Sequence, residues 1–281
     1  MPFHRFLAAL LLACLLSAAA SAQTLIKRNV AYGSDEEQRL DIYAPEQARN
    51  APVILLVHGG AWRNGDKDSR YLLENKLARW LPRGFVVVAV NYRLLPKARP
   101  LEQAQDVARA MAMAQSLAPS YGGDRNKFIL MGHSAGGHLV ALLAAKPALA
   151  TAEGARPWLG SVVLDSGALN VPAIMTVRHL PLYERAFGSD PTYWTSVSPY
   201  HQLSGRTAPI LFICSRLRLE ACPQAREFVS RAESFGTRSA ALGQDLSHAE
   251  INHLLGIESP YTTAVEAFMR GLDIGIGEAL K

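Results

Sequence analysis

The most informative ten residues of this sequence read Lys127-Phe128-Ile129-Leu130-Met131-Gly132-His133-Ser134-Ala135-Gly136. A short apolar run, typical of a buried strand, leads into Gly-x-Ser-x-Gly, and the apolar residues 137–145 then predict a buried helix. The two glycines leave room where side chains would collide, so that Ser134 stands exposed on a sharp strand-to-helix turn. The pattern predicts a nucleophilic serine, with an ordinary glycine-rich turn as the alternative.

A second motif ends the apolar strand 52–57 and reads HGGAW at residues 58–62. Small residues after a strand let backbone N–H groups approach the oxyanion that forms when a nucleophile attacks an ester carbonyl. We expect the amides of Gly60, Ala61 and Ala135 to form this oxyanion hole. Either motif alone also fits a local glycine turn, but the two in this order favour an acyl-transfer site.

Apolar runs alternate with amphipathic stretches along the rest of the chain, which predicts a mostly parallel sheet with crossover helices. The reactive loops of such a sheet gather at the carboxyl ends of its strands, where both motifs lie. Strands are expected over 26–32, 39–43, 53–57, 86–90, 128–131, 161–164, 210–214 and 239–242, the first two as an antiparallel edge pair. Helices are expected over 69–81, 101–118, 137–145, 224–235 and 261–272.

The composition predicts one soluble domain. The chain has 281 residues, of which 49% are hydrophobic and 19% charged, enough to bury a sizeable core. The formal net charge of +5 comes from scattered Lys and Arg residues rather than a stripe. No nucleic-acid partner is therefore expected.

Four features together resemble the α/β-hydrolase esterases: HGGAW at 58–62, VNYRL at 90–94, GHSAGG at 132–137 and a late histidine. The likeness covers about residues 25–275 and is nearest to the hormone-sensitive-lipase-like, feruloyl-esterase-like and arylformamidase-like branches. It implies the α/β-hydrolase fold, with helices on both faces of the sheet and a small cap at about 169–203. It also implies hydrolysis of carboxylic esters, or of amides and formamides, by a Ser-His-acid triad with no metal and no cofactor.

The other two members of that triad should follow Ser134 in the order acid, then histidine. His248 lies between the last expected strand and the final helix, and it resembles the family's catalytic base. The acid is expected after the strand that ends at Cys214, where Glu220 is the available carboxylate. Asp245 and Asp165 are the alternatives, and Asp165 also fits a simple turn.

The substrate pocket is expected between the oxyanion loop and the cap. Trp62 belongs to the first motif and His133 to the second, and both are predicted to line the pocket. The cap segment is rich in aromatic residues, which would suit an apolar or aryl substrate, although core packing explains them equally well.

The N-terminus predicts a leader peptide over residues 1–22. His4 and Arg5 precede an apolar stretch that is too short to span a bilayer permanently, and small residues follow at 20–22. Export to the periplasm or the medium is therefore expected, with a mature domain over 23–281. Cys214 and Cys222 would then remain, either as a disulfide or as two buried thiols.

These features predict an exported serine carboxylesterase that cleaves short acyl or aryl esters through an acyl-enzyme intermediate. An amide or formamide hydrolase with the same triad is the alternative, and a non-catalytic binding relative of the fold is a further one. The expected partner is a small-molecule ester, with no stable membrane span. The chain is expected to be a monomer or a homodimer.

Overall fold

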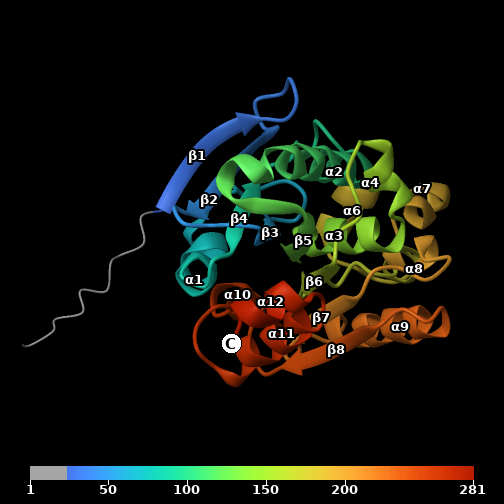
Figure 1. The fold of residues 1–281 in the computed structure, drawn as a ribbon. Helices are drawn as coiled ribbons and strands as arrows, with labels where there is room; N and C mark the ends of the chain where they lie inside the picture. The colour runs from blue at the N-terminus through green and yellow to red at the C-terminus, as the bar shows by residue number, and fades with distance from the viewer. Residues whose placement is uncertain (1–23) are drawn as a thin grey trace, which may run out of the picture.

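One eight-stranded sheet runs through the molecule (Figure 1). The computed structural model describes residues 24–281, so the expected leader peptide, 1–22, lies outside the described residues. The strands are β1 (Thr24–Ala31), β2 (Arg39–Pro45), β3 (Ala51–Val57), β4 (Val86–Val90), β5 (Gly123–His133), β6 (Gly160–Leu164), β7 (Ile210–Ser215) and β8 (Ser239–Gln244).

The strands lie in the order β1-β2-β4-β3-β5-β6-β7-β8. β2 pairs antiparallel with both β1 and β4, whereas all pairings from β4–β3 to β7–β8 are parallel. The predicted parallel sheet with an antiparallel pair at one edge is confirmed. The carboxyl ends of β3, β5, β6 and β7 therefore meet at the same edge of the sheet.

Helices cover both faces of this sheet (Figure 1). The longer ones are α1 (Arg70–Trp80), α2 (Pro100–Leu117), α3 (Ala135–Ala145), α9 (Ala221–Ser234) and α11 (Pro260–Arg270). The shorter ones are η1 (Ala118–Tyr121), α4 (Ala148–Ala152), α5 (Val171–Met175), α6 (Pro181–Phe187), α7 (Pro191–Ser196), α8 (Pro199–Gln202), α10 (His248–His253) and α12 (Ile274–Ala279).

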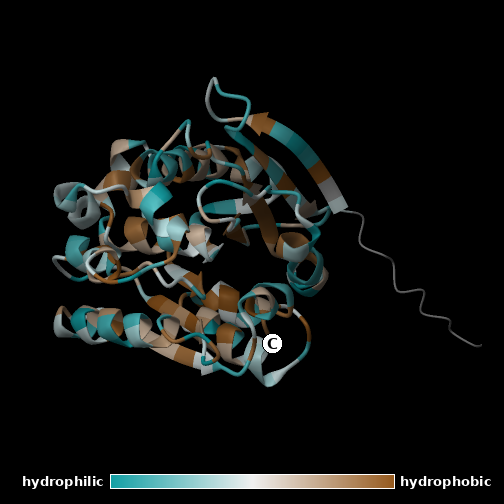
Figure 2. Ribbon diagram, turned by 180° about the vertical axis from the view of Figure 1, so that it is seen from behind, coloured by the Kyte–Doolittle hydropathy of each residue, from teal (hydrophilic) through white to brown (hydrophobic). Residues whose placement is uncertain are grey.

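Strand β3 shows how the sheet separates two hydrophobic cores. Val53, Leu55 and Val57 face the core shared with α2, α3 and α9, while Ile54 and Leu56 face the core shared with α1, α11 and α12. Because both faces are covered, the parallel strands read as continuous apolar runs rather than as alternating ones. Figure 2 shows the same arrangement, with apolar residues concentrated on the central strands.

The segment 169–203 departs from the regular alternation of strands and helices. It holds the four short helices α5 to α8, each with a proline at its first or second position. Proline is tolerated there because its fixed φ suits a helix start and its missing N–H would have no partner. Within residues 24–281, no helix is both long and apolar enough to cross a membrane.

A disulfide joins Cys214 in β7 to Cys222 in α9, which answers the question left open by the sequence. It brackets residues 215–221, the loop at the carboxyl end of β7. This loop carries Arg218 and Glu220, and it leads toward the site described next.

Candidate active site

Ser134 lies on the turn between β5 and α3 in a strained backbone conformation, with φ 55° and ψ −118°. Its N–H donates to the carbonyl of Leu164 at 2.9 Å, which fixes the turn over the end of β6. A Cβ at Gly132 would collide with the carbonyl of Gly136, and one at Gly136 would collide with that of His58. The glycines of the motif are therefore required by close backbone packing, as the sequence predicts.

The hydroxyl of Ser134 is the first member of a hydrogen-bonded row. His248 Nε2 lies 3.0 Å from Ser134 Oγ, and His248 Nδ1 lies 2.6 Å from Asp165 Oδ2. Asp165 directly follows β6, and its carboxylate is fully buried. Its Oδ1 accepts a hydrogen bond from the amide of Ser215, and its Oδ2 accepts one from Arg218 Nη1, both at 2.8 Å.

The expected pairing of Glu220 with His248 is not found in the part of the chain that the structure describes. Glu220 Oε1 instead accepts a hydrogen bond from Arg218 Nη2 at 2.6 Å. Asp245, an earlier alternative, forms an exposed ion pair with Arg216. Because β6 and β7 are parallel neighbours, both strand ends face His248, and Asp165 occupies the position next to the imidazole. The signal for Asp165 was its place directly after an apolar strand.

The contacts of Asp165 keep its carboxylate ionised. Burial alone would raise its pKa, but hydrogen bonds from His248, the Ser215 amide and Arg218 lower the pKa to about 2. An ionised Asp165 at 2.6 Å holds the proton on His248 Nδ1, which leaves Nε2 free to accept the proton of Ser134. Such a row can move a proton from the hydroxyl to the imidazole during nucleophilic attack.

His133 packs against the His248 ring and is hydrogen-bonded to the His248 backbone. Its Nε2–H donates to the His248 carbonyl at 2.9 Å, and the two ring centroids lie 4.5 Å apart. Burial, with a contribution from the charge of His248, lowers the pKa of His133 to about 3. His133 is therefore neutral near pH 7 and contributes orientation rather than charge.

Helix α10, which begins at His248, is fixed at both ends. At its start, Ser247 accepts from the amide of Glu250, whose carboxylate accepts from the amide of Ser247, forming a capping box. At its end, Lys76 Nζ of α1 donates to the carbonyl and to the side-chain oxygen of Asn252 at 2.6 and 3.0 Å. The position of the imidazole is thus set by α1 as well as by its own helix.

The loop after β3 has consecutive residues in the left-handed region, with φ +118° at Gly60, 52° at Ala61 and 59° at Trp62. This conformation turns the loop around the end of β3. The Trp62 carbonyl accepts from Gln103 Nε2 at 2.8 Å and from the amide of Leu95 at 2.9 Å. Both bonds anchor the loop at Trp62, directly after Gly60 and Ala61.

Those two amides have no hydrogen-bond acceptor among residues 24–281. The amide of Ala135 stands at the first position of α3, where a helix offers no internal partner. Gly60 borders one cavity at Ser134, Ala135 borders a second, and Ala61 borders both. Three donors are thus available around Ser134, as the sequence predicts for an oxyanion hole.

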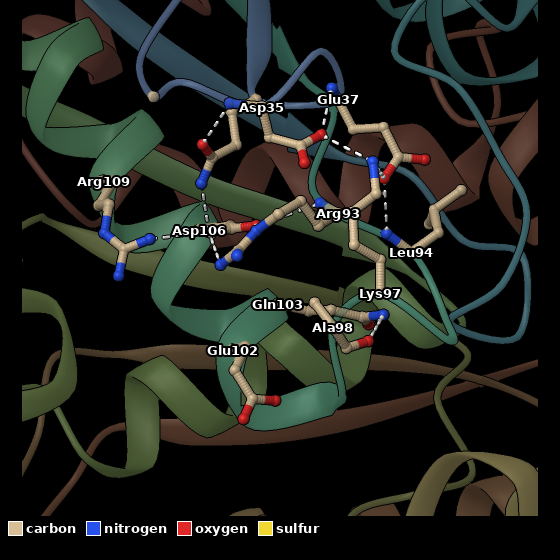
Figure 3. Close-up of polar contacts among 12 residues, drawn as sticks. Asp35, Glu37, Arg93, Leu94, Lys97, Ala98, Glu102, Gln103, Asp106 and Arg109 are labelled. Carbon is tan, nitrogen blue, oxygen red and sulfur yellow. Dashed lines mark hydrogen bonds and ion pairs between the residues drawn. The ribbon is translucent and has the colours of Figure 1, made fainter.

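Residues of α2 form a polar network beside this loop, and Figure 3 shows its contacts around Asp106 and Gln103. Asp106 is fully buried and receives two hydrogen bonds from the Arg93 guanidinium, at 2.7 and 2.8 Å. Arg109 and Gln38 donate to the same carboxylate. One turn earlier on α2, Gln103 donates to the Trp62 carbonyl, so α2 connects Gln38, which precedes β2, to the oxyanion loop.

Two cavities open on either side of Ser134. The first, of about 530 Å³, is bordered by His133 and by polar residues of the loop after β3. The second, of about 250 Å³, is bordered by Trp62 and by residues of the 169–203 segment. Ala61, Ser134, Leu182 and His248 border both. A further hollow of about 860 Å³, near the amino ends of the strands, shares no residue with this site.

No group of three or more His, Cys, Asp or Glu side chains in residues 24–281 is arranged to hold a metal ion.

Comparisons with known proteins agree with this architecture. The BD-FAE family model matches residues 40–159. The chain is 36% identical over 117 residues to a probable isoprenylcysteine alpha-carbonyl methylesterase of Oryza sativa subsp. japonica, covering 41% of this chain and 28% of that protein. It is 31% identical over 241 residues to esterase LipQ of Mycobacterium tuberculosis, covering 79% of this chain and 55% of that protein.

Among solved structures, a truncated carbohydrate esterase from gut microbiota superposes with a TM-score of 0.74 at 20% identity, covering 94% of this chain and 99% of that one. The sheet and the serine turn thus define the α/β-hydrolase fold. The family-model match and the esterase relatives support an α/β-hydrolase esterase family for this chain. The matches span only about a quarter to a half of the length of the curated relatives.

Proposed function

We propose that this protein is a serine hydrolase that cleaves carboxylic esters through an acyl-enzyme intermediate. The observation that carries the proposal is the row Ser134 Oγ, His248 Nε2 and Nδ1, Asp165 Oδ2, with separations of 3.0 and 2.6 Å. The names of the related esterases support the same reaction class. In this proposal Asp165, rather than Glu220, is the acid of the triad.

The reaction starts with attack of Ser134 Oγ on the ester carbonyl carbon, while the hydroxyl proton passes to His248 Nε2. The amides of Gly60, Ala61 and Ala135 donate to the oxyanion. When the tetrahedral intermediate collapses, the bond to the alkoxide breaks and His248 returns its proton to that oxygen, releasing the alcohol. Water then attacks the acyl-enzyme by the same proton route and releases the carboxylic acid.

The size of the cavities supports short acyl or aryl esters as substrates. In this proposal the smaller second cavity, bordered by Trp62 and Leu182, receives the acyl group, and the larger first cavity receives the alcohol. A cavity of about 250 Å³ with mostly apolar walls suits a short chain or one ring. The leader sequence adds export to the proposal, with the active protein in the periplasm or the medium.

Hydrolysis of p-nitrophenyl acetate by the mature protein, beside Ser134→Ala, tests the proposal. We expect turnover and covalent labelling by a fluorophosphonate in the wild type and neither in the variant. An inactive, unlabelled wild type would reject the hydrolase assignment. Activity against a formanilide but not against esters would instead make the protein an amide hydrolase.

A further inference from the structure

Arg218 lies beside the proposed triad, and the mechanism above does not use its charge. Its Nη1 is 2.8 Å from Asp165 Oδ2 and 3.0 Å from His248 Nδ1, and it also donates to the Asp165 carbonyl at 3.0 Å. Its Nη2 donates to Glu220 Oε1 at 2.6 Å. The Arg218 guanidinium therefore lies between two members of the triad, Asp165 and His248, and a second carboxylate, that of Glu220.

The short distance between Arg218 and His248 is not a hydrogen bond in the working tautomer. His248 Nδ1 carries the proton that it shares with Asp165, so Nδ1 has no lone pair to accept from Arg218. Both nitrogens instead converge as donors on Asp165 Oδ2. The result is a positive charge 3.0 Å from the ring that must itself become positive in the transition state.

The surrounding loop holds this guanidinium in place. The disulfide closes residues 215–221 at their base, and Ser215 Oγ donates to the Leu246 carbonyl at 2.6 Å. A Cβ at Gly167 would lie 3.1 Å from Arg218 Nη2 and 3.3 Å from the hydroxyl of Tyr183. The Arg218 side chain is 23% exposed, so water screens its charge only in part.

We propose that Arg218 and Glu220 are positioning residues that act through Asp165 to set the pH at which His248 becomes protonated. This inference rests on the proposed hydrolase function. Arg218 orients the Asp165 carboxylate and disfavours the imidazolium, and Glu220 offsets the charge of Arg218. The charges alternate along His248, Asp165, Arg218 and Glu220 once the imidazole accepts its proton.

Charged and titratable groups from several elements face His248. They are His133 at the end of β5, Asp165 after β6, Arg218 and Glu220 after β7, Tyr183 on α6, His58 and Asp66 in the loop after β3, and Lys76 on α1 behind His133. Apart from the control at Arg216, the test alters only Arg218 and Glu220, so the groups named here contribute equally to the other profiles.

The test is the pH dependence of kcat/KM for p-nitrophenyl acetate. Arg218→Met removes the cation, so the imidazole should accept a proton more readily. The pH at which kcat/KM falls to half on the acid side of the profile, called the midpoint here, should then rise by about one pH unit. Glu220→Gln removes the compensating anion, so the midpoint should move in the opposite direction by a smaller amount. Arg218→Lys keeps the charge but not the fork geometry, so kcat should fall while the midpoint stays near that of the wild type.

Arg216→Met is the matched control, because Arg216 lies in the same loop and its one ion pair within residues 24–281 is with the exposed Asp245. Its midpoint should stay unchanged. Midpoints that move in the same direction, or not at all, in Arg218→Met and Glu220→Gln would overturn the proposal. Should Arg218→Met not fold, as judged by circular dichroism, a midpoint of Glu220→Gln that is unmoved or raised would still overturn it.

The outcomes separate this inference from the proposed function. A wild type that neither hydrolyses esters nor reacts with a fluorophosphonate rejects both. A wild type that is active, with unmoved midpoints in the charge variants, rejects only the role of Arg218 and Glu220.

Discussion

Asp165 and Glu220 show how contacts assign different roles to two carboxylates of the same neighbourhood. Asp165 is fully buried and receives hydrogen bonds from Ser215, Arg218 and His248, whereas Glu220 is 39% exposed and pairs with Arg218. A buried carboxylate with several donors has a fixed orientation, as a residue that holds a histidine tautomer requires.

Asp165→Asn should therefore lower kcat on the order of 10³–10⁴-fold, because an amide no longer fixes the proton on His248 Nδ1. Glu220→Gln should lower kcat at the pH optimum by less than about fivefold, since it removes only a partly exposed ion pair. Steady-state kinetics with p-nitrophenyl acetate compares the two. Near-normal turnover in Asp165→Asn would contradict the assignment of the acid.

The sequence predicted Ser134, His248 and the oxyanion residues, and the structure brings these residues together. For the acid, however, the sequence favoured Glu220 over Asp165. The order serine, acid, histidine is satisfied by both carboxylates. Which of the two carboxylates contacts His248 depends on the distance from each strand end to the imidazole. A short stretch of sequence does not reveal that distance, because it is set by contacts between distant segments. The available hint was the place of Asp165 directly after the apolar strand 161–164.

Helix α10 depends on a neighbouring element for its position. Lys76 of α1 is buried, and its ammonium contacts only the carbonyl and side-chain oxygens of Asn252 among the described residues. Burial lowers the pKa of Lys76 to about 7, well below its ordinary value of 10.5. The connection between α1 and α10 is therefore sensitive to pH.

Between pH 7 and pH 10.5 the unfolded chain binds a proton at Lys76 that the folded protein has released. The contribution of Lys76 to the free energy of unfolding should then rise with pH across this window, by at most about 1.4 kcal/mol per pH unit. Below pH 7 Lys76 is charged in both the folded and the unfolded protein, so burial of its charge lowers the free energy of unfolding by its full amount.

Urea unfolding of the wild type and Lys76→Met from pH 6 to pH 10 measures this effect. We expect the stability of the wild type relative to the variant to increase as the pH rises above 7. Lys146→Met, which removes an exposed lysine at the end of α3, is the control. Parallel pH profiles for wild type and Lys76→Met would contradict the prediction.

The elements themselves could largely be predicted, because the buried strands and long helices carry clear apolar patterns. The exceptions were α5 to α8, which are too short to show a helical period and begin at prolines that also mark turns. Strand β5 begins at Gly123, whereas the sequence analysis expected its start at Phe128. The first part of the strand was missed because most of its residues are polar and incompletely buried.

The two cavities at Ser134 determine which esters we expect the protein to hydrolyse. Leu182 of α6 borders both cavities, so its side chain lies at the junction where they meet. We expect kcat/KM to be highest for acetyl to butyryl p-nitrophenyl esters and at least about tenfold lower for the decanoyl ester.

Leu182→Ala should move this optimum toward longer chains, because it widens the junction. Leu219→Ala replaces a leucine that is 94% exposed, and it should leave the chain-length profile unchanged. A wild-type optimum at decanoate, or an identical profile in Leu182→Ala, would show that this junction does not limit the acyl group.

The ends of β6 and β7 lie side by side, because Leu164 and Ile213 are paired in register. Asp165 after β6 and Arg218 after β7 therefore reach the same imidazole from neighbouring strands. The order of the strands in the sheet, and not closeness along the chain, brings these opposite charges together at His248.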